Sequence, residues 1–487
     1  MTPTPEHRHI VVIGAGFGGI GLTIKLREAG FDDVLVLERA DDLGGTWRAN
    51  TYPGCACDVP SQLYSYSFAP NPHWSRVYGQ QREILEYLRS VAAEHDVPQH
   101  IRFRTELLDA RWDDDRAVWD IDTTGGRLTA DFLISATGVF AEAKYPRIAG
   151  ADTFAGTSFH SLHWDHAHDL RGERVAVIGT GASAVQFVPE IQPLVKELLL
   201  FQRSAPWIVP RLDRPTLALE RQLLSRLPLA RKAIRGSWYA AIEGFGLISL
   251  VDQRFRHLYE PLARFQLRRQ VADPRLRRTL TPDYVIGCKR AIFSDAYLPA
   301  LTRPNVEVVT TGIAEIRPHS IVLRDGAERA VDTIVYATGF TPIPSAYDRI
   351  TGRAGTSVAE LYDQEPQSYL GVALAGFPNF FMTLGPFGAA GNQSAVFMIE
   401  SQITYIVDAL KTVRRNGSRR VEVRPAVQER FLAEMAERSS STVWLTGGCE
   451  SYYTTPDGRN AGLYPNWSFE YRRRTRRFDA RSYEVTR

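Results

Sequence analysis

The stretch HIVVIGAGFGGIGLTIKLREAGFDDVLVLERA, residues 9–40, decides the fold. It reads as an apolar strand, a G-x-G-x-x-G turn at Gly14, Gly16 and Gly19, a helix, and a second apolar run that ends in Glu38. Such a turn brings the main chain close to a pyrophosphate, which free N–H groups at the helix N-terminus bind. A carboxylate at Glu38 can accept hydrogen bonds from ribose hydroxyls. The stretch therefore predicts a site for a dinucleotide without a 2′-phosphate, either FAD or NAD.

The same pattern returns at RVAVIGTGASAVQFVPEIQPLVKELLLFQRS, residues 174–204. Gly179 and Gly181 open the turn, an alanine replaces the third glycine, and the second apolar run leads to Arg203. Arg203 follows its first glycine by 24 residues, as Glu38 does in the first unit. Arginine can pair with a 2′-phosphate through two hydrogen bonds, whereas an acid would repel it. We expect an NADP site here; a merely exposed arginine is the alternative.

Two further segments, DFLISATGVF (131–140) and VDTIVYATGF (331–340), each run from an apolar strand into Ala-Thr-Gly. They resemble the points at which flavoproteins with two dinucleotide sites cross from one nucleotide domain to the other. The fold class is therefore predicted as α/β, with two Rossmann-like dinucleotide-binding domains. Two such sites in one chain indicate hydride transfer from NADPH to a bound flavin.

The domain boundaries follow from these segments and from a change in composition. The stretch 211–287 lacks strand alternation and is rich in Leu, Ala and Arg, which is typical of helices. The expected division is an FAD domain at 1–145 and 375–487, an NADP domain at 150–210 and 288–374, and a helical insertion at 211–287.

Charge and composition exclude several classes. The net charge of +3 gives no case for nucleic acid, and the basic run 472–477 is interpreted as solvated surface. The N-terminus has no apolar core typical of a secretory signal, and the apolar run 239–251 is too short to span a bilayer. Four cysteines suit a reducing cytoplasm rather than a disulfide scaffold, and Cys55 and Cys57 are interpreted as ordinary thiols. We expect a cytoplasmic protein without integral membrane association; the oligomeric state stays open.

The stretch FAGTSFHSLHWD, which contains Phe154, Gly156, His160, Trp164 and Asp165, spells F-x-G-x-x-x-H-x-x-x-W-D. It resembles the fingerprint of Baeyer–Villiger monooxygenases that use one FAD and NADPH. Amine- and sulfur-oxidising flavin monooxygenases share the Phe, Gly and His but lack the closing Trp-Asp. The resemblance implies a linker between the FAD and NADP domains that senses their relative motion. A zinc site at the clustered histidines is the alternative, but no cysteine or paired ligand set supports it, and no metal is expected.

A second family pattern occurs in GGTWRANTYPGCACD, residues 44–58. The segments VPSQLYSYSF (59–68), FMIESQITYIV (397–407) and GRNAGLYPNWSFEYRRRTRRFD (458–479) are most similar to the branch that contains hydroxyacetophenone monooxygenase. The resemblance covers nearly the whole chain. It implies an enzyme that takes O₂ and a small hydrophobic ketone and forms an ester or lactone through a flavin C4a-peroxide.

The resemblance also implies site residues. Arg290 matches the arginine that stabilises charge on the peroxide and the ketone adduct, and Asp58 matches the residue that holds it. Lys289 would reach the NADP 2′-phosphate together with Arg203 and Ser204. The remaining matched positions are Thr46, Trp47 and Tyr64 for FAD, and Thr180, Gly181, Ser183 and Gln186 around the NADP pyrophosphate.

Two alternative functions remain open beside this one. They are an N- or S-oxygenating flavin-containing monooxygenase and a non-oxygenating flavoprotein that senses NADPH or transfers electrons; Arg290 with Asp58 argues against both. The chain departs from the family pattern at Ala56, Asn392 and Asn466, where relatives carry other residues. We expect these departures to change the shape of the pocket rather than the reaction.

Overall fold

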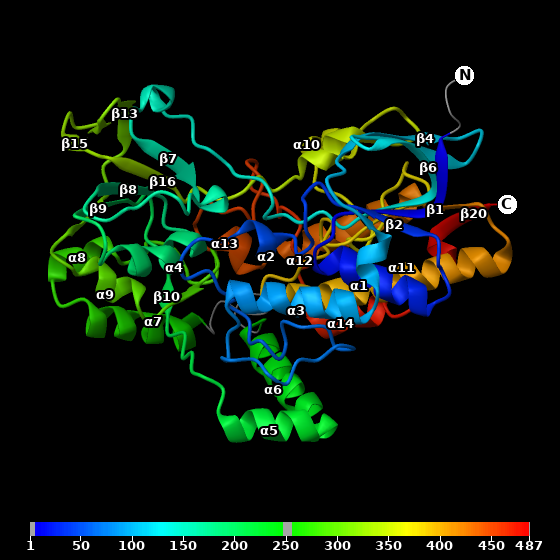
Figure 1. Ribbon diagram of the computed structural model, residues 1–487, viewed down its shortest axis with the longest axis horizontal. Helices are drawn as coiled ribbons and strands as arrows, with labels where there is room; N and C mark the ends of the chain where they lie inside the picture. Colours follow the sequence, from blue (N-terminus) through cyan, green and yellow to red (C-terminus); the bar gives the residue numbers. More distant parts are fainter. Residues whose placement is uncertain (1–4, 247–255, 487) are drawn as a thin grey trace.

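Two β-sheets lie side by side in the computed structural model, which describes residues 5–246 and 256–486 (Figure 1). The larger sheet contains, in spatial order, β17 (Ile350–Thr351), β4 (Leu107–Asp113), β5 (Val118–Thr123), β6 (Gly126–Ser135), β1 (Glu6–Ile13), β2 (Val34–Leu37) and β3 (Ile101–Arg102), with β18 (Phe380–Met382) also paired to β6. The second sheet is parallel throughout and contains β12 (Val306–Val309), β9 (Glu197–Phe201), β8 (Arg174–Ile178), β16 (Thr333–Tyr336) and β7 (Thr157–His160).

Each sheet is built around one of the two predicted units. In the first unit, β1 leads through α1 (Phe17–Glu28) to β2, which pairs with β1 in parallel. In the second, β8 leads through α4 (Ala182–Ile191) to β9 in the same way. The central strands are buried on both faces, which explains their uninterrupted apolar sequences. The α/β prediction with two Rossmann-like units is confirmed.

The chain crosses between the units at the two Ala-Thr-Gly segments. It leaves the first sheet after β6, enters the second at β7, and leaves the second after β16. The two crossing segments bond to each other, because Lys144 N donates to Gly339 O at 3.0 Å and Thr341 N donates to Glu142 O at 3.0 Å. The junction is thus a pair of adjoining segments rather than two separate linkers.

The return to the first unit comes earlier than the sequence predicted. Strand β17 pairs with β4 of the larger sheet, and Tyr347, Val358 and Tyr362 share a buried cluster with Trp119. Residues 345–364 therefore pack in the first unit, although the expected NADP domain extended to 374. The return strand is only two residues long, so no apolar run marks it in the sequence.

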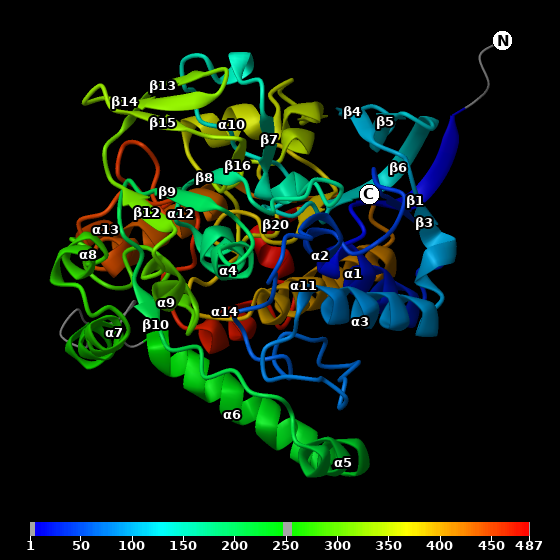
Figure 2. The same ribbon diagram turned by 60° about the vertical axis from the view of Figure 1, so that its left-hand side comes forward.

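Within the segment 211–287, where a helical insertion was expected, the described residues are mostly helical. Its helices are α5 (Ala218–Arg226), α6 (Pro228–Gly246), α7 (Arg256–Gln270) and α8 (Pro274–Thr279). Helix α6 runs from the body of the molecule to α5, which lies at the far end of a projection in both views (Figures 1 and 2). The end of the apolar run 239–251 lies outside the described residues. Within the described ranges, no helix is long and apolar enough to cross a membrane.

The remaining elements complete the two units. The helices are α2 (Thr46–Ala49), α3 (Gln81–Glu94), α9 (Tyr297–Leu301), α10 (Val358–Gln364), α11 (Ala395–Asn416), α12 (Pro425–Ser439), α13 (Val443–Thr446) and α14 (Ser468–Arg474). The short strands are β10 (Ile208–Val209), β11 (Ile292–Phe293), β13 (Ile313–Arg317), β14 (Ser320–Leu323), β15 (Glu328–Ala330), β19 (Arg420–Val423) and β20 (Tyr483–Thr486). Helix α11 packs against α1, where Ile403 and Ile406 share a buried cluster with Ile20 and Ile24.

Candidate active site between the two dinucleotide units

The first glycine turn leaves the main chain open to a ligand. Gly14 has φ +99°, and a Cβ atom on Gly19 would lie 1.9 Å from Gly14 O, so side chains are excluded at both positions. Gly16 faces Gly45 of the next loop, and a Cβ on Gly45 would lie 3.0 Å from Gly16 Cα. Two main-chain segments thus meet without side chains at the N-terminus of α1, as a pyrophosphate requires.

Glu38 lies at the end of β2 beside this turn. Its Oε2 atom accepts a hydrogen bond from Ala15 N at 2.8 Å and its Oε1 atom from Ala40 N at 2.9 Å. The side chain is buried, so these two bonds fix the carboxylate at the edge of the turn. Its position fits the predicted contact with the ribose of FAD.

Three predicted FAD positions lie on the loop that follows. Thr46 and Trp47 form the start of α2, and Trp47 Nε1 donates to the Tyr64 hydroxyl at 3.1 Å. The ring of Tyr64 packs edge-on against Phe17 of α1, with ring centroids 5.2 Å apart. Burial raises the pKa of Tyr64, so its hydroxyl stays protonated. The structure therefore gathers these residues beside the first glycine turn.

The second glycine turn has the same geometry. Gly179 has φ +111°, and a Cβ there would lie 2.4 Å from Ala337 O. Apart from Gly181 itself and its two chain neighbours, no heavy atom of the described residues lies within 4 Å of a Cβ built on Gly181, so the approach to the N-terminus of α4 is open. Thr180 Oγ1 donates to Ser204 O at 3.1 Å, which ties the turn to the end of β9.

Two cations lie together beyond β9. Lys289 Nζ donates to Ser204 Oγ at 2.8 Å. Burial lowers the pKa of Lys289, and the nearby positive charge of Arg203 lowers it further. Adjacent like charges are unfavourable unless an anion joins them, so Arg203, Ser204 and Lys289 suit a 2′-phosphate.

Gln186 of α4 points toward the first unit. Its Oε1 atom accepts a hydrogen bond from the Tyr52 hydroxyl at 3.0 Å, and its Nε2 atom donates to Ala56 O at 2.9 Å. Ser183, one turn earlier, contributes a hydrogen bond that lowers the pKa of Tyr52 against the larger effect of burial. The polar side of α4 thus connects the NADP unit to the loop that carries Asp58. The contact of Ser183 and Gln186 with the pyrophosphate stays a prediction.

Arg290 and Asp58 form the ion pair that the family resemblance implied. Arg290 Nε donates to Asp58 Oδ2 at 2.7 Å, and an NH1 hydrogen bond of 3.3 Å reaches Gly391 O. The charge of Asp58 holds the pKa of Arg290 well above its usual value. Burial raises the pKa of Asp58, but the charge of Arg290 outweighs it and leaves the pKa below the usual range. A permanently charged guanidinium is therefore fixed where the segments that carry Asp58, Arg290 and Gly391 meet.

The aromatic fingerprint packs on the second unit. The ring of Phe154 lies over Gly156, where a Cβ would come within 2.7 Å of Phe154 Cζ and 2.2 Å of Asp332 O. The ring of Trp164 packs against Phe187 of α4 at an interplanar angle of 56°, with ring centroids 5.2 Å apart. Asp165 accepts a hydrogen bond from Ala167 N at 2.9 Å and so caps the following turn. The glycine in this motif is explained first by the Asp332 carbonyl and then by the phenylalanine ring that covers it.

His160 lies at the junction of the two units. It is fully buried at the end of β7, and its ring contacts Tyr145 and Phe340, which belong to the two crossing segments. Nδ1 accepts a hydrogen bond from Leu162 N at 3.1 Å. Burial lowers the pKa of His160 to about 4. The expected linker position is thus occupied by a neutral imidazole between both crossings.

The other histidines of this stretch have partners of their own or face the solvent. His163 and His166 are exposed, and His166 Nε2 lies 2.8 Å from Thr51 Oγ1. In the part of the chain that the structure describes, no group of three His, Cys, Asp or Glu side chains is arranged to hold a metal ion.

The structure adds three features that sequence reasoning missed. Cys288 and Cys449 form a disulfide across 161 residues, against the expectation of thiols, while Cys55 and Cys57 are free and buried. No motif or spacing in the sequence predicts a bond between two cysteines so far apart. Glu243 of α6 is buried and accepts hydrogen bonds from Gln393 Nε2 at 2.9 Å and Ser468 N at 2.7 Å.

The third feature concerns two of the departures from the family pattern. The side-chain amide of Asn392, next to the carbonyl that Arg290 contacts, is buried and has no hydrogen-bond partner among the described residues. Asn466 instead turns inward to its own chain, and its Oδ1 atom accepts from Trp467 N at 2.8 Å. The sequence marked Asn392 as a departure from the family pattern, but it gave no sign that the amide would be buried without a partner.

Two Rossmann units with open glycine turns, and an ion-paired arginine where they meet, define a flavoprotein with two dinucleotide sites. A family model described as pyridine nucleotide-disulphide oxidoreductase matches residues 11–235. A Baeyer-Villiger monooxygenase of Streptomyces coelicolor is 46% identical over 99% of this chain and 93% of its own. One from Pseudomonas aeruginosa is 44% identical over the same shares. The chain belongs to the family of Baeyer–Villiger monooxygenases.

Solved structures agree with this assignment. Cyclohexanone monooxygenase from Rhodococcus sp. Phi1 bound to NADP+ is 29% identical, with a TM-score of 0.88 over 99% of this chain and 100% of that one. The OTEMO complex with FAD and NADP is 28% identical, with a TM-score of 0.90 over the same shares. The predicted family, enzyme class and cofactors are confirmed: this is a monooxygenase that uses FAD and NADPH.

Proposed function

We propose that the enzyme inserts one oxygen atom of O₂ beside the carbonyl of a small hydrophobic ketone and releases an ester or lactone. The observation that carries this proposal is the placement of Arg290, held by Asp58 on one side and by Gly391 O on the other. Oxygen insertion into a carbonyl compound builds negative charge on the attacking and the carbonyl oxygen. A fixed cation at that point stabilises the charge.

Arginine suits this task better than lysine or histidine would. Its guanidinium stays charged and does not give up a proton to the anion beside it. Asp58 keeps the guanidinium plane in one orientation because it accepts the hydrogen bond from Nε. The other guanidinium nitrogens stay free to donate to Gly391 O and to the substrate. We assign Arg290 as the catalytic cation and Asp58 as its positioning residue.

When bound, FAD supplies the redox chemistry by which electrons from NADPH activate O₂. The residues that would hold it are those of the first glycine turn, Glu38 and the Trp47–Tyr64 pair. The residues that would hold NADPH are those of the second turn with Arg203, Ser204 and Lys289. The hydrogen bonds between Gln186 and the Ala56 and Tyr52 loop keep the NADP unit next to the loop that carries Asp58.

The names of relatives support a ketone substrate. Solved neighbours are a cyclohexanone monooxygenase and a steroid monooxygenase bound to NADP, and both structures cover 99% of this chain. We propose a carbonyl substrate of the same apolar kind.

The test combines a substrate panel with a variant. Purified holoenzyme is given NADPH, O₂ and a set of cyclic, aryl and steroid ketones, with thioethers and amines alongside, and products are identified by mass spectrometry. Esters or lactones are expected from ketones. A panel that yields only sulfoxides or N-oxides would assign the enzyme to the heteroatom-oxygenating class, and NADPH oxidation without any oxygenated product would favour an electron-transfer flavoprotein.

The variant Arg290→Ala should lower ester formation roughly 10²–10³-fold while FAD stays bound and NADPH is still oxidised, with H₂O₂ as the product. Arg211→Ala is the matched control, because Arg211 also lies beside this loop but donates to a main-chain oxygen, Cys57 O, at 3.1 Å. Normal ester yield per NADPH in Arg290→Ala would show that Arg290 is only a structural partner of Asp58.

A further inference from the structure

The α5–α6 arm, residues 212–232, carries an unusual share of the exposed apolar side chains. The described part of the chain exposes fourteen large hydrophobic side chains, and six of them are leucines of this short arm, between 48% and 80% exposed. The six are Leu212, Leu217, Leu219, Leu223, Leu227 and Leu229. Single exposed leucines are common on proteins, but a cluster of this size marks an interaction surface.

The arm is also cationic. It contains five arginine or lysine residues and two acids, so its net charge is +3. Both acids are already paired: Asp213 with Arg76 at 2.8 Å, and Glu220 with Arg214 at 2.8 Å. Arg221, Arg226 and Lys232 are exposed between the leucines. The surface offered to a partner is therefore apolar and positive at once.

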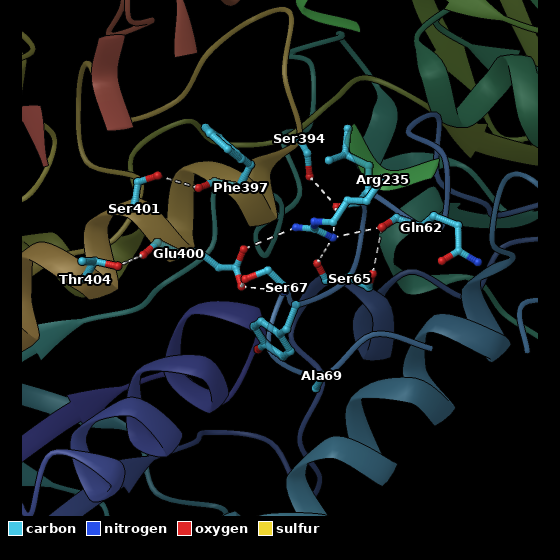
Figure 3. Close-up of polar contacts among 12 residues, drawn as sticks. Gln62, Ser65, Ser67, Ala69, Arg235, Ser394, Phe397, Glu400, Ser401 and Thr404 are labelled. Atoms are coloured by element: carbon cyan, nitrogen blue, oxygen red, sulfur yellow. Dashed lines mark hydrogen bonds and ion pairs between the residues drawn. The ribbon is translucent and has the colours of Figure 1, made fainter. Parts of the chain in front are cut away.

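The arm is anchored firmly at its base, as Figure 3 shows. The guanidinium of Arg235 on α6 donates to the carbonyl oxygens of Gln62 at 2.9 Å and Ser65 at 2.9 Å, and it forms an ion pair of 3.4 Å with Glu400. The same Glu400 carboxylate accepts from Ser67 N at 2.7 Å. Leucines on a held arm need little further ordering when they meet a partner.

We propose that the α5–α6 arm docks on the surface of an anionic lipid bilayer. Its leucines would enter the boundary between headgroups and acyl chains, and its arginines and lysine would meet lipid phosphates. Helix α5 has nine residues and cannot span a bilayer, so the contact is interfacial. A second copy of this chain is the less suitable occupant, because a symmetric contact through the arm would bring one +3 surface against another.

The test is flotation of the full-length holoenzyme with vesicles of phosphatidylcholine alone or with phosphatidylglycerol. Binding is expected only to the vesicles that contain phosphatidylglycerol, and weaker at about 0.5 M than at about 0.05 M salt. Each cation near an anionic surface contributes roughly fivefold in affinity, so Arg226→Gln/Lys232→Gln should bind roughly 25-fold more weakly. Leu219→Gln/Leu223→Gln should lose binding by at least about tenfold.

The matched control is Leu262→Gln/Phe265→Gln, which removes two exposed apolar side chains from α7 instead of the arm. It should bind vesicles as the unaltered protein does, and all variants should oxidise NADPH normally, which shows that they are folded. The proposal is overturned if the unaltered protein does not float with anionic vesicles, or if the arm and α7 variants bind equally. A concentration-dependent dimer that the leucine variant abolishes, without vesicle binding, would identify the arm as a self-association surface instead.

Discussion

Acid should weaken the junction between the two units through His160. The imidazole is fully buried, and burial lowers its pKa to about 4 from an ordinary value of 6.5. Protonation would place a charge among the rings of Tyr145 and Phe340. It would also put a hydrogen on Nδ1, which now accepts from Leu162 N. The folded protein therefore takes up this proton less readily than the unfolded chain does.

The sign and the size of the effect follow from these two pKa values. The stability contributed by neutral His160 is fully present above pH 6.5 and is lost as the pH falls toward 4, because the unfolded state then binds more protons. One pKa unit corresponds to about 1.4 kcal/mol, so the whole shift corresponds to about 3 kcal/mol. About 2 kcal/mol of it should be lost by pH 5.

The assay is urea unfolding at pH 8 and pH 5 of the unaltered protein, His160→Asn and His163→Gln. Asparagine does not titrate, and its side-chain oxygen can still accept from Leu162 N, so this variant should lose about 2 kcal/mol less between the two pH values. His163 is exposed, and its variant should follow the unaltered protein. Equal losses in the unaltered protein and in His160→Asn would refute the reasoning.

Three further predictions concern the cofactor sites and the fingerprint. Arg203→Ala/Lys289→Ala should reduce the preference for NADPH over NADH in kcat/KM by roughly 30- to 1000-fold, while Arg171→Ala, an exposed arginine in the same unit, should leave it unchanged. Asp58→Asn keeps an acceptor for Arg290 but loses the charge, so its ester yield per NADPH should be roughly tenfold below that of the unaltered protein and above that of Arg290→Ala. An unchanged yield would show that Asp58 does not position Arg290. Gly156→Ala should lower the free energy of unfolding in urea by about 1–3 kcal/mol through its clash with Asp332 O, whereas Gly181→Ala should leave stability nearly unchanged and weaken NADPH binding in coenzyme titrations. A larger loss of stability in Gly181→Ala than in Gly156→Ala, with weaker NADPH binding only in Gly156→Ala, would contradict the structure.

Local patterns in the sequence predicted the fold well because the decisive contacts are local. A glycine turn between two apolar strands can be recognised in the sequence, because Gly14 and Gly179 both need a positive φ, which glycine adopts readily. The parallel pairing of β1 with β2 and of β8 with β9 then follows from strand burial. The early return of the chain was missed because β17 is too short to carry a pattern in the sequence, and its place depends on pairing with β4 and on packing in a distant buried cluster.

The candidate site could not be predicted from local sequence patterns alone. Arg290 and Asp58 lie 232 residues apart, and only the family resemblance paired them before the structure did. No resemblance announced the disulfide between Cys288 and Cys449 or the buried Glu243 network, because each depends on how the insertion and the C-terminal segment fold back. In the sequence, the leucines of the arm indicated only that this segment is helical. Only the structure shows that they face outward.

Three consecutive residues connect the parts of this enzyme that must act together. Cys288 is covalently joined to Cys449 of the C-terminal segment, Lys289 bonds to Ser204 beside the predicted NADP phosphate site, and Arg290 bonds to Asp58 of the FAD-side loop. The three side chains thus reach three different parts of the molecule from one short segment. A shift of this segment would move Lys289 and Arg290 together. We therefore expect Lys289→Ala, which removes the bond to Ser204, to lower the ester yield per NADPH as well, although no described hydrogen bond joins Lys289 to Asp58.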